Sequence, residues 1–551
     1  MLKYKIKNQS TSNTIGYFQP QPEEIKSLEQ GLVKLAENGF DDFLRNYLLD
    51  IFLSFSIIEQ KKILEKLAEE KNPFLKSFGA EAAHISKDFL MEDFNFDISY
   101  LKKNTSLIYL RSLSMADRRE HGNFSEKISK NINHHNFPES PCPNILADET
   151  PVEFIRQISQ MGKKETLAEN KTEKDLLTHV LNQFEKASII PGTEMRHLTS
   201  LCPHAILRKW YMKTKISSCG TEFTFEGLQT SYGKGFDIES SRISCLMEMC
   251  ERISSFASIE DLKITSRKKD PGLIKISYSR GLEKNMPMLD PNNIRLEIPY
   301  NDETLFWMKA EQALSHKNRK EIFIPAQLSY LFLNLPEPSL FSALDSTGLA
   351  SGDTGERAKL GGIFEAVERD CDYSTPFTLE SCFRIKSSLP EINTLFDFYK
   401  DMGVDFFFQD ITNKSGIPAY RAFVYGIDKI IYKGCSSHLD SKKAIIDALF
   451  EVPFPLINNQ PSARATYDLP YRELEKLPDY SQKNVKENLF LMESLFFENN
   501  LSIIYSELTR PDIEIPVFKT IIPGFEINGE FDEYSRISKR QYNNFKTIFR
   551  D

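Results

Sequence analysis

Two stretches of the sequence carry acidic residues at the same spacing, and carboxylates arranged in this way can hold divalent cations. In each stretch three glutamates stand nine and then three positions apart, and an arginine follows the last of them. The two sets are Glu239, Glu248, Glu251 and Arg252, and Glu356, Glu365, Glu368 and Arg369. Glycines precede each set, within 233–235 and 348–355, and a fainter third copy runs over 438–451. Such repetition indicates duplication of one supersecondary unit.

The spacing places the acidic side chains of each stretch on one face of a helix. Positions i, i+4 and i+7 share a face, so Ser244, Glu248 and Glu251 project together, and Glu365 and Glu368 lie one turn apart. A solvated face of salt bridges is the ordinary interpretation of this pattern, because Glu and Arg are mostly found at surfaces. The residues that flank these glutamates are mostly apolar, however, which predicts two buried helices.

Carboxylates that are buried together need neutralisation or a cation, because a buried unpaired charge is strongly destabilising. Mg²⁺ is the expected cation, since it prefers carboxylate oxygens together with water and the phosphates of a nucleotide. The sequence contains no G-x-x-x-x-G-K-[ST] motif. Bound ATP would therefore be held through metal ions rather than by a glycine-rich phosphate loop. The repeated glutamates predict a phosphoryl-transfer site.

The rest of the chain must supply the elements that position these helices. Apolar residues recur every three or four positions from about 22 to 114, which predicts a helical N-terminal domain over 1–130. Prolines and polar residues predict a linker region over 131–175. Beyond it, strand-like runs at 321–325, 405–408, 419–425 and 515–522 alternate with helical patterns. We therefore expect an α+β fold, with one large domain of repeated strand and helix units over 176–551.

Composition and charge disfavour several functional classes. The 551 residues include 69 Lys and Arg against 78 Asp and Glu, and this net charge of -9 disfavours nucleic acid and anionic lipid as partners. We find no pattern of a signal peptide or a membrane span. The eight cysteines form no C-x-x-C pair, which fits reduced thiols better than a zinc site or a disulfide framework. We expect a cytoplasmic protein.

Taken together, the motifs resemble those of the YcaO family, and they occur in the family's order over about 189–526. The two helices contribute Ser244-x3-Glu248-x2-Glu251-Arg252 and Glu365-x2-Glu368-Arg369, the second after Ser-Thr-Gly-Leu-Ala-Ser-Gly-Asp-Thr at 346–354. His438-Leu439-Asp440, Leu-Thr-Arg-Pro-Asp-Ile at 508–513 and Ile-Pro-Gly-Phe-Glu at 522–526 follow.

The resemblance implies an α+β domain that binds ATP through Mg²⁺ held by glutamates. It places Glu248, Glu251, Glu365 and Glu368 at metal positions, and Ser244, Asp353 and Arg369 at cofactor-binding positions. Members of the family activate a peptide amide oxygen by phosphorylation, after a neighbouring side chain or external sulfide has attacked the carbonyl. The products are azolines or thioamides in ribosomally made peptides. The resemblance assigns no catalytic residue in this chain.

Three positions depart from the family pattern. Asp353 stands where the family has Asn, Arg357 where it has a further metal-binding Glu, and Asp447 where it has a phosphate-facing Arg. Arg357 and Asp447 compensate for each other if they pair across the pocket. If they do not, the chain is a non-catalytic binding or accessory protein that keeps the fold. A third hypothesis is an accessory factor for the modification of a ribosomal protein.

The resemblance also has consequences for partners. The sequence lacks the fused partner domain and the proline-rich tail that cyclodehydratases of the family commonly have. We therefore expect a peptide or protein substrate to be presented by a separate partner, either E1-like or TfuA-like. A homodimer is compatible with the resemblance.

Overall fold

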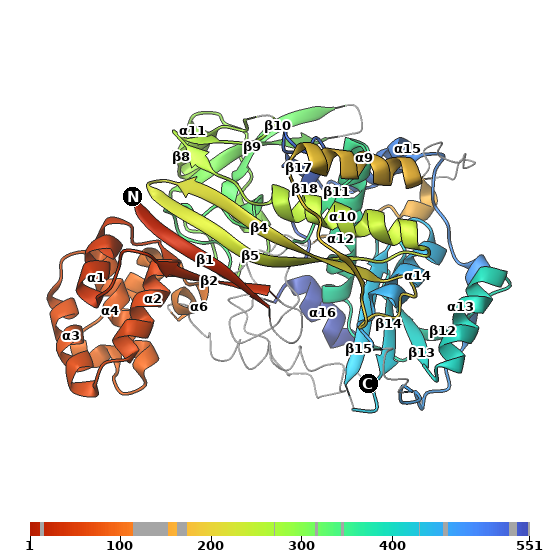
Figure 1. The fold of residues 1–551 in the computed structure, drawn as a ribbon, viewed down its shortest axis with the longest axis horizontal. Coiled ribbons are helices and arrows are strands. Elements are labelled where there is room, and N and C mark those ends of the chain that lie inside the picture. Colours follow the sequence, from red (N-terminus) through yellow and green to blue (C-terminus); the bar gives the residue numbers. More distant parts are fainter. Residues whose placement is uncertain are drawn as a thin grey trace.

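The computed structural model describes residues 1–10, 16–113, 152–161, 173–268, 270–314, 318–342, 346–428, 430–455, 461–527 and 537–548. Helices and strands pack around the central helices α10 (Ile238–Ser254), α12 (Gly355–Ser374) and α14 (Ser441–Glu451), as Figure 1 shows. The predicted α+β class is confirmed. Among the described residues, none of the helices has the length and hydropathy that crossing a bilayer requires.

The first part of the chain is mostly helical and lies at one end of the molecule (Figure 1, red and orange). Its helices are α1 (Leu28–Glu37), α2 (Asp42–Leu53), α3 (Ile57–Glu69), α4 (Pro73–Ser86), η1 (Met91–Phe94), α5 (Ser99–Asn104) and α6 (Ile108–Ser112). Leu35, Leu48 and Leu64, one from each of the first three helices, are fully buried. The apolar spacing thus marks the packed faces, as predicted.

The chain nevertheless begins with strands, which the prediction of a helical domain over 1–130 missed. β1 (Leu2–Ser10) pairs antiparallel with β2 (Gly16–Pro22) and parallel with β5 (Thr221–Gly233). Tyr4 and Ile6 are buried, so the alternation of apolar residues with lysine over 2–6 is a strand pattern. The Tyr4 ring also stacks on Phe223 of β5, with 5.0 Å between centroids. A sheet therefore joins the two predicted domains.

Of the predicted linker region, 152–161 and 173–175 lie within the described residues; the latter begin α9, and the former part is packed rather than free. Val152 and Ile158, the latter in η3 (Ile158–Gln160), are buried in a hydrophobic cluster. The Asn499 side chain accepts hydrogen bonds from the backbone N–H groups of Ile155 and Arg156, at 2.6 and 2.9 Å. This segment is anchored by contacts that are distant in sequence, which explains why its composition did not predict them.

All the strands together form three larger sheets and a small one among the described residues. The first has the order β2-β1-β5-β4-β3, the second β10-β9-β17-β18-β11 with β8 on β9, and the third β15-β14-β13-β12-β16. Their remaining strands are β3 (Glu194–Arg196), β4 (Ile206–Ser218), β8 (Leu273–Ile276), β9 (Leu305–Ala313), β10 (Arg319–Pro325), β11 (Leu349–Ser351), β12 (Cys382–Lys386), β13 (Phe406–Asp410), β14 (Ala419–Tyr425), β15 (Ile431–Ser437), β16 (Tyr471–Glu473), β17 (Ile503–Glu507) and β18 (Val517–Ile521), and β6 (Ile259–Glu260) pairs with β7 (Lys263–Ile264).

The three copies of the sequence repeat are built alike. In the first copy the antiparallel hairpin β4/β5 precedes α10, and in the third the hairpin β14/β15 precedes α14. In the second copy β11 precedes α12 and pairs with β18. In each copy, a strand is therefore followed in the chain by the helix that carries the acidic residues.

Further helices cover these sheets. They are α9 (Glu173–Lys186), α11 (Tyr278–Glu283), α13 (Pro390–Asp401), α15 (Val485–Glu498) and α16 (Lys539–Ile548), with the short helices η4 (Pro291–Asn293), η5 (Ala326–Leu328) and η7 (Leu474–Lys476). Figure 1 shows α9 lying along α10, and α16 beside the lower end of α12.

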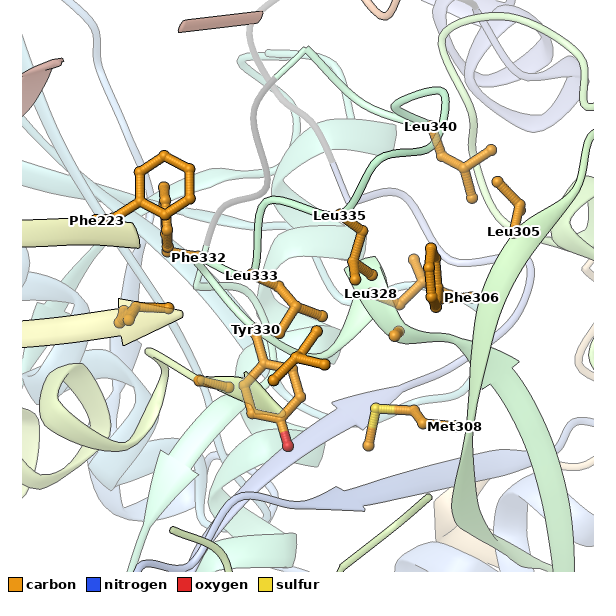
Figure 2. Packing of buried hydrophobic residues seen from close by; sticks show 14 of the residues in the cluster. Phe223, Leu305, Phe306, Met308, Leu328, Tyr330, Phe332, Leu333, Leu335 and Leu340 are labelled. Atoms are coloured by element: carbon orange, nitrogen blue, oxygen red, sulfur yellow. The ribbon is translucent and has the colours of Figure 1, made fainter. Parts of the chain in front are cut away.

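One hydrophobic core supports the helical end and the first two sheets together. Figure 2 shows its centre, where Phe223 of β5 faces Phe332 and where Leu328 and Leu335 lie beside Phe306 of β9. The rings of Phe223 and Phe332 meet edge to face, with 5.0 Å between centroids. Aromatic pairs of this geometry stabilise a core beyond the area they bury. This packing fixes β5 and, through it, the start of α10.

Candidate functional site

A cavity of about 1450 Å³ opens between α10, α12 and α14. Residues of the first turns of these helices and of α15 line it. Pockets for small ligands usually measure ~300–1000 Å³. The cavity therefore has room for a nucleotide together with part of a second substrate.

Four helices begin at this cavity, and each has a capped N-terminus. Asp237, Thr354, Asp440 and Asn484 accept backbone hydrogen bonds from the first turns of α10, α12, α14 and α15, respectively. A helix N-terminus carries partial positive charge and favours anions. The lining also contains lysines, namely Lys234, Lys442, Lys443 and Lys486, of which Lys234 pairs with Glu451 and Lys486 with Glu356. This part of the cavity attracts anionic groups such as phosphates.

The first glutamate of each duplicated pair is held in the same way. Glu248 accepts a hydrogen bond from the backbone N–H of Tyr232 at 2.7 Å, and Glu365 accepts one from Gly348 at 3.0 Å. Both donors lie in the segment that precedes the glutamate's own helix. The duplication therefore extends from the spacing of the glutamates to their backbone partners.

Gly348 is required for this contact. Its φ is +78°, a conformation that L-residues with a side chain rarely adopt. A Cβ atom there would lie 2.2 Å from the carbonyl oxygen of Thr520. Only glycine lets the chain approach β18 so closely and direct its N–H at Glu365.

A second contact joins the two copies directly. The backbone N–H and the hydroxyl of Ser351 donate to Oε1 of Glu251, at 2.9 and 3.0 Å. The same hydroxyl lies 3.1 Å from the carbonyl oxygen of Met247. Ser351 belongs to β11, which leads into α12. The second copy therefore fixes the orientation of a glutamate in the first.

The carboxylates repel one another in a poorly solvated place. Burial, with the nearby carboxylates of Glu365 and Glu248, raises the pKa of Glu251 to about 8. Burial also raises the pKa of Glu248, and it holds the pKa of Glu368 well above its usual value. The side chains of Glu248, Glu365 and Glu368 are 24%, 24% and 19% exposed. A cation that enters the cavity can therefore reach Glu365 and Glu368, which line it, and would relieve the repulsion among the carboxylates.

The donor set fits Mg²⁺ when phosphates complete the coordination. Among the described residues, no three His, Cys, Asp or Glu side chains come close enough to hold a metal ion by themselves. Mg²⁺ commonly binds through one or two carboxylates together with water and substrate phosphates. Glu365 and Glu368, at a cavity that also carries lysines and helix N-termini, match that requirement.

Comparison with known proteins identifies the family. The sequence model of the YcaO family, described as a YcaO cyclodehydratase that binds ATP and Mg²⁺, matches residues 232–526, which is more than half of the chain. The chain belongs to the YcaO family. The predicted membership is confirmed, and the predicted cofactors, ATP and Mg²⁺, are those of the family.

Individual relatives are more distant. An uncharacterized protein of Methanothermobacter thermautotrophicus is 26% identical over 331 residues, which cover 54% of this chain and 81% of the relative. An uncharacterized protein in the tfuA 3' region of Rhizobium leguminosarum bv. trifolii is 27% identical over 244 residues, 41% of this chain and 54% of the relative. The chain thus spans about half the length of the second relative. The YcaO structure from Methanopyrus kandleri, bound with AMPPCP and Mg²⁺, is 16% identical with a TM-score of 0.45, over 65% of this chain and 92% of that one.

Of the predicted metal ligands, Glu365 and Glu368 line the cavity, whereas Glu248 and Glu251 are not among its lining residues; the predicted cofactor-binding residues of this YcaO protein do line it. Ser244 and Arg369 line it, together with Asp353. Arg369 stands between the two glutamates of its own helix, 3.9 Å from Glu365 and 3.9 Å from Glu368. A guanidinium in this position lowers the repulsion between the carboxylates. Its roles, like those of the other site residues, stay predictions.

The three departures from the YcaO pattern, Asp353, Arg357 and Asp447, face the same cavity. Arg357 donates to Oδ1 of Asp353 at 2.9 Å, and Asp353 lies just before the start of α12. Burial raises the pKa of Asp447 to about 6, and neighbouring Lys443 partly opposes this. Arg357 thus engages the oxygen of Asp353 that was predicted to face the cofactor.

The ion pair between Lys234 and Glu451 was not predicted from the sequence. Lys234 Nζ lies 2.6 Å from Oε2 of Glu451, and both residues line the cavity. Lys234 precedes α10 and Glu451 ends α14, so the pair links the first and third copies of the repeat. Both residues stand in motifs that the sequence had singled out, at 233–235 and 438–451, which was the available signal. Their distance in sequence hid the pairing.

We expect the buried side chain of His438, in the third copy of the repeat, to make the stability of the protein depend on pH. Its Nδ1 accepts the backbone N–H of Asp440 at 3.0 Å, and its ring lies 4.7 Å from that of Phe364. Burial, assisted by Lys443, lowers the pKa of His438 to about 3. Between about pH 6.5 and pH 3 the unfolded chain therefore binds a proton that the folded chain does not. This difference removes ~1.4 kcal/mol of stability per pH unit as the pH falls.

Chemical denaturation of the native chain and of His438→Asn measures this effect. Asn retains an oxygen for the Asp440 N–H but does not titrate, so the loss of stability from pH 6.5 to pH 5 should be smaller in the variant. His179→Asn, at an exposed position of α9, is the control and should follow the native chain. Equal pH slopes for the native chain and His438→Asn would contradict the prediction.

Proposed function

We propose that this YcaO protein uses Mg·ATP to phosphorylate a backbone amide oxygen of a peptide or protein, and that the product is an azoline or a thioamide. The observation that carries the proposal is that poorly solvated, mutually repelling glutamates of two duplicated helices lie together, and that two of them, Glu365 and Glu368, line a cavity that also carries lysines and helix N-termini. A cytoplasmic location and a separate E1-like or TfuA-like partner that presents the substrate belong to the same proposal. The cysteines among the described residues are free thiols, which is compatible with that location.

When bound, Mg·ATP would supply the phosphoryl group and neutralise the glutamates. A thiol, a hydroxyl or sulfide adds to the amide carbonyl, and the oxygen of that adduct displaces ADP from the γ-phosphate. The oxygen then leaves as phosphate, which is a far better leaving group than hydroxide, while the nitrogen–carbon or sulfur–carbon double bond forms with loss of a proton.

The residues of this chain have distinct tasks in the proposal. Glu248, Glu251, Glu365 and Glu368 would provide oxygen ligands for Mg²⁺, each ion taking one or two of them together with water and phosphate oxygens, because no three of the described acidic side chains can hold a metal by themselves. Arg369 lies beside Glu365 and Glu368 with a planar fork of donors suited to phosphate oxygens. Ser244 is exposed on the wall that α10 contributes to the cavity, where it can donate to the nucleotide.

Calorimetric titration with Mg·ATP, followed by an isotope experiment, tests the proposal. We expect the native chain to bind ATP with Mg²⁺ present and not after EDTA is added. A precursor peptide encoded beside the gene, labelled with ¹⁸O at its amides, should then transfer ¹⁸O to the released phosphate when the partner is supplied. Phosphate without ¹⁸O, formed while the peptide is modified, would contradict amide phosphorylation.

The presence of Arg357 and Asp447 in the cavity favours one alternative, a non-catalytic accessory protein that keeps the fold. This alternative predicts that the native chain does not bind Mg·ATP and that Arg357→Glu combined with Asp447→Arg creates binding. ATP turnover by the native chain would exclude it. An isolated gene, without a precursor-peptide or TfuA-like gene beside it, would favour a role in ribosomal-protein modification.

A further inference from the structure

Helix α12 carries Glu365, Glu368 and Arg369 on its cavity side, and a buried acid directly follows them. Asp370 has no exposed surface. It projects about 200° around the helix from Glu368, and therefore away from the cavity. The group that binds Asp370 thus holds α12 from behind the predicted metal ligands.

That group is Arg540 of α16. Its Nη1 donates to Oδ2 of Asp370 at 2.9 Å, and its Nη2 donates to Oδ1. The Asn413 side chain and the backbone N–H of Glu526 also donate to Asp370, each at 3.0 Å. Arg540 in turn lies 3.4 Å from the Glu526 carboxylate. Asp370 is therefore bound on both oxygens, and Arg540 provides its positive charge.

Helix α16 also binds the C-terminal end of α12. The last carbonyl groups of an α-helix have no partners within the helix. Gln541 donates to the carbonyl of Tyr373 at 3.2 Å, and Asn544 donates to the carbonyl of Ser374 at 2.9 Å. Three side chains of α16 therefore fix the rotation and the axial position of α12.

From this arrangement we infer that Arg540 is a positioning residue for the metal site: it holds α12 in the register at which Glu365 lies beside Glu251 and both Glu365 and Glu368 line the cavity. The inference rests on the proposed function, because it takes these glutamates as ligands of Mg·ATP. Groups that orient metal ligands from behind commonly change metal affinity ~10- to 100-fold when they are replaced. If α12 rotated, its glutamates and those of α10 would no longer be directed at the same place.

Replacement of Arg540 tests the inference in the full chain. The readout is the Mg²⁺ concentration that half-saturates ATP binding, measured below the unfolding temperature of every variant. We expect Arg540→Met to raise this concentration ~10- to 100-fold. Arg540→Lys keeps the charge but loses the two-pronged contact, so it should restore part of the affinity. If Arg540→Met does not fold, the shift in Arg540→Lys alone decides.

A matched control separates positioning from general stability. Arg45 forms a buried pair with Glu81 at 2.8 Å in the helical end, where both side chains are 0% exposed, compared with 15% for Arg540 and 0% for Asp370. Arg45→Met should lower the unfolding temperature and leave the half-saturating Mg²⁺ concentration unchanged. Native half-saturation in Arg540→Met, or an equal shift in Arg45→Met, would overturn the inference while the proposed function stands. Absence of Mg·ATP binding by the native chain would instead defeat the proposed function, and the inference with it.

Discussion

Glu251→Gln should make the ligand-free protein more stable and should abolish its response to Mg·ATP. The raised pKa of Glu251, about 8, means that the folded chain either protonates this carboxyl or tolerates a repelled charge. Glutamine removes that penalty and keeps an oxygen for the Ser351 hydrogen bonds. The expected gain is ~1–3 kcal/mol near pH 7, and it should shrink as the pH falls toward 4.5.

The same substitution removes a predicted Mg²⁺ ligand, so affinity for Mg·ATP should fall by at least ~100-fold. Thermal unfolding with and without Mg·ATP measures both effects, since a ligand that binds only the folded chain raises its unfolding temperature. Glu239→Gln is the matched control, because Glu239 lies in the first turn of the same helix, about three turns from Glu251, and is not one of the carboxylates that raise the pKa of Glu251. A destabilised Glu251→Gln that still responds to Mg·ATP would show that this glutamate is structural.

Much of the fold followed from local patterns. The strand predicted at 419–425 coincides with β14, and the one predicted at 321–325 lies within β10. Both contain the β-branched and aromatic residues that favour strands. β1 was missed because its lysines mask a short alternation, and because its partner β5 is some 200 positions away in the sequence. Pairing at that distance is decided by tertiary packing, as in the stacking of Tyr4 on Phe223.

In the site, too, local spacing could be predicted, whereas contacts between distant elements could not. Helical spacing placed Glu248 beside Glu251 and Glu365 beside Glu368, since residues three apart share a face. Periodicity could not show that Ser351 of the second copy binds Glu251 of the first, because that contact depends on how two helices cross. Nor could it show the contact between Asp370 and Arg540, which are 170 positions apart.

Arg369 should act on stability in the opposite direction to Glu251. It lies 3.9 Å from both Glu365 and Glu368, and its removal leaves their repulsion unopposed. Arg369→Gln should therefore lower the unfolding temperature of the ligand-free chain. It should also reduce affinity for Mg·ATP by ~10- to 100-fold, because a charge-assisted contact to phosphate is lost.

Arg369→Lys distinguishes the two effects, because lysine restores the charge but not the planar fork. We expect its unfolding temperature to return to near the native value, whereas its nucleotide affinity should recover only in part. Arg156→Gln removes a well-exposed arginine, paired with Glu498 away from the cavity, and should change neither quantity appreciably. If Arg369→Gln were more stable than the native chain, the carboxylates would not be repelling one another, and the electrostatic basis for a magnesium site on these helices would be lost.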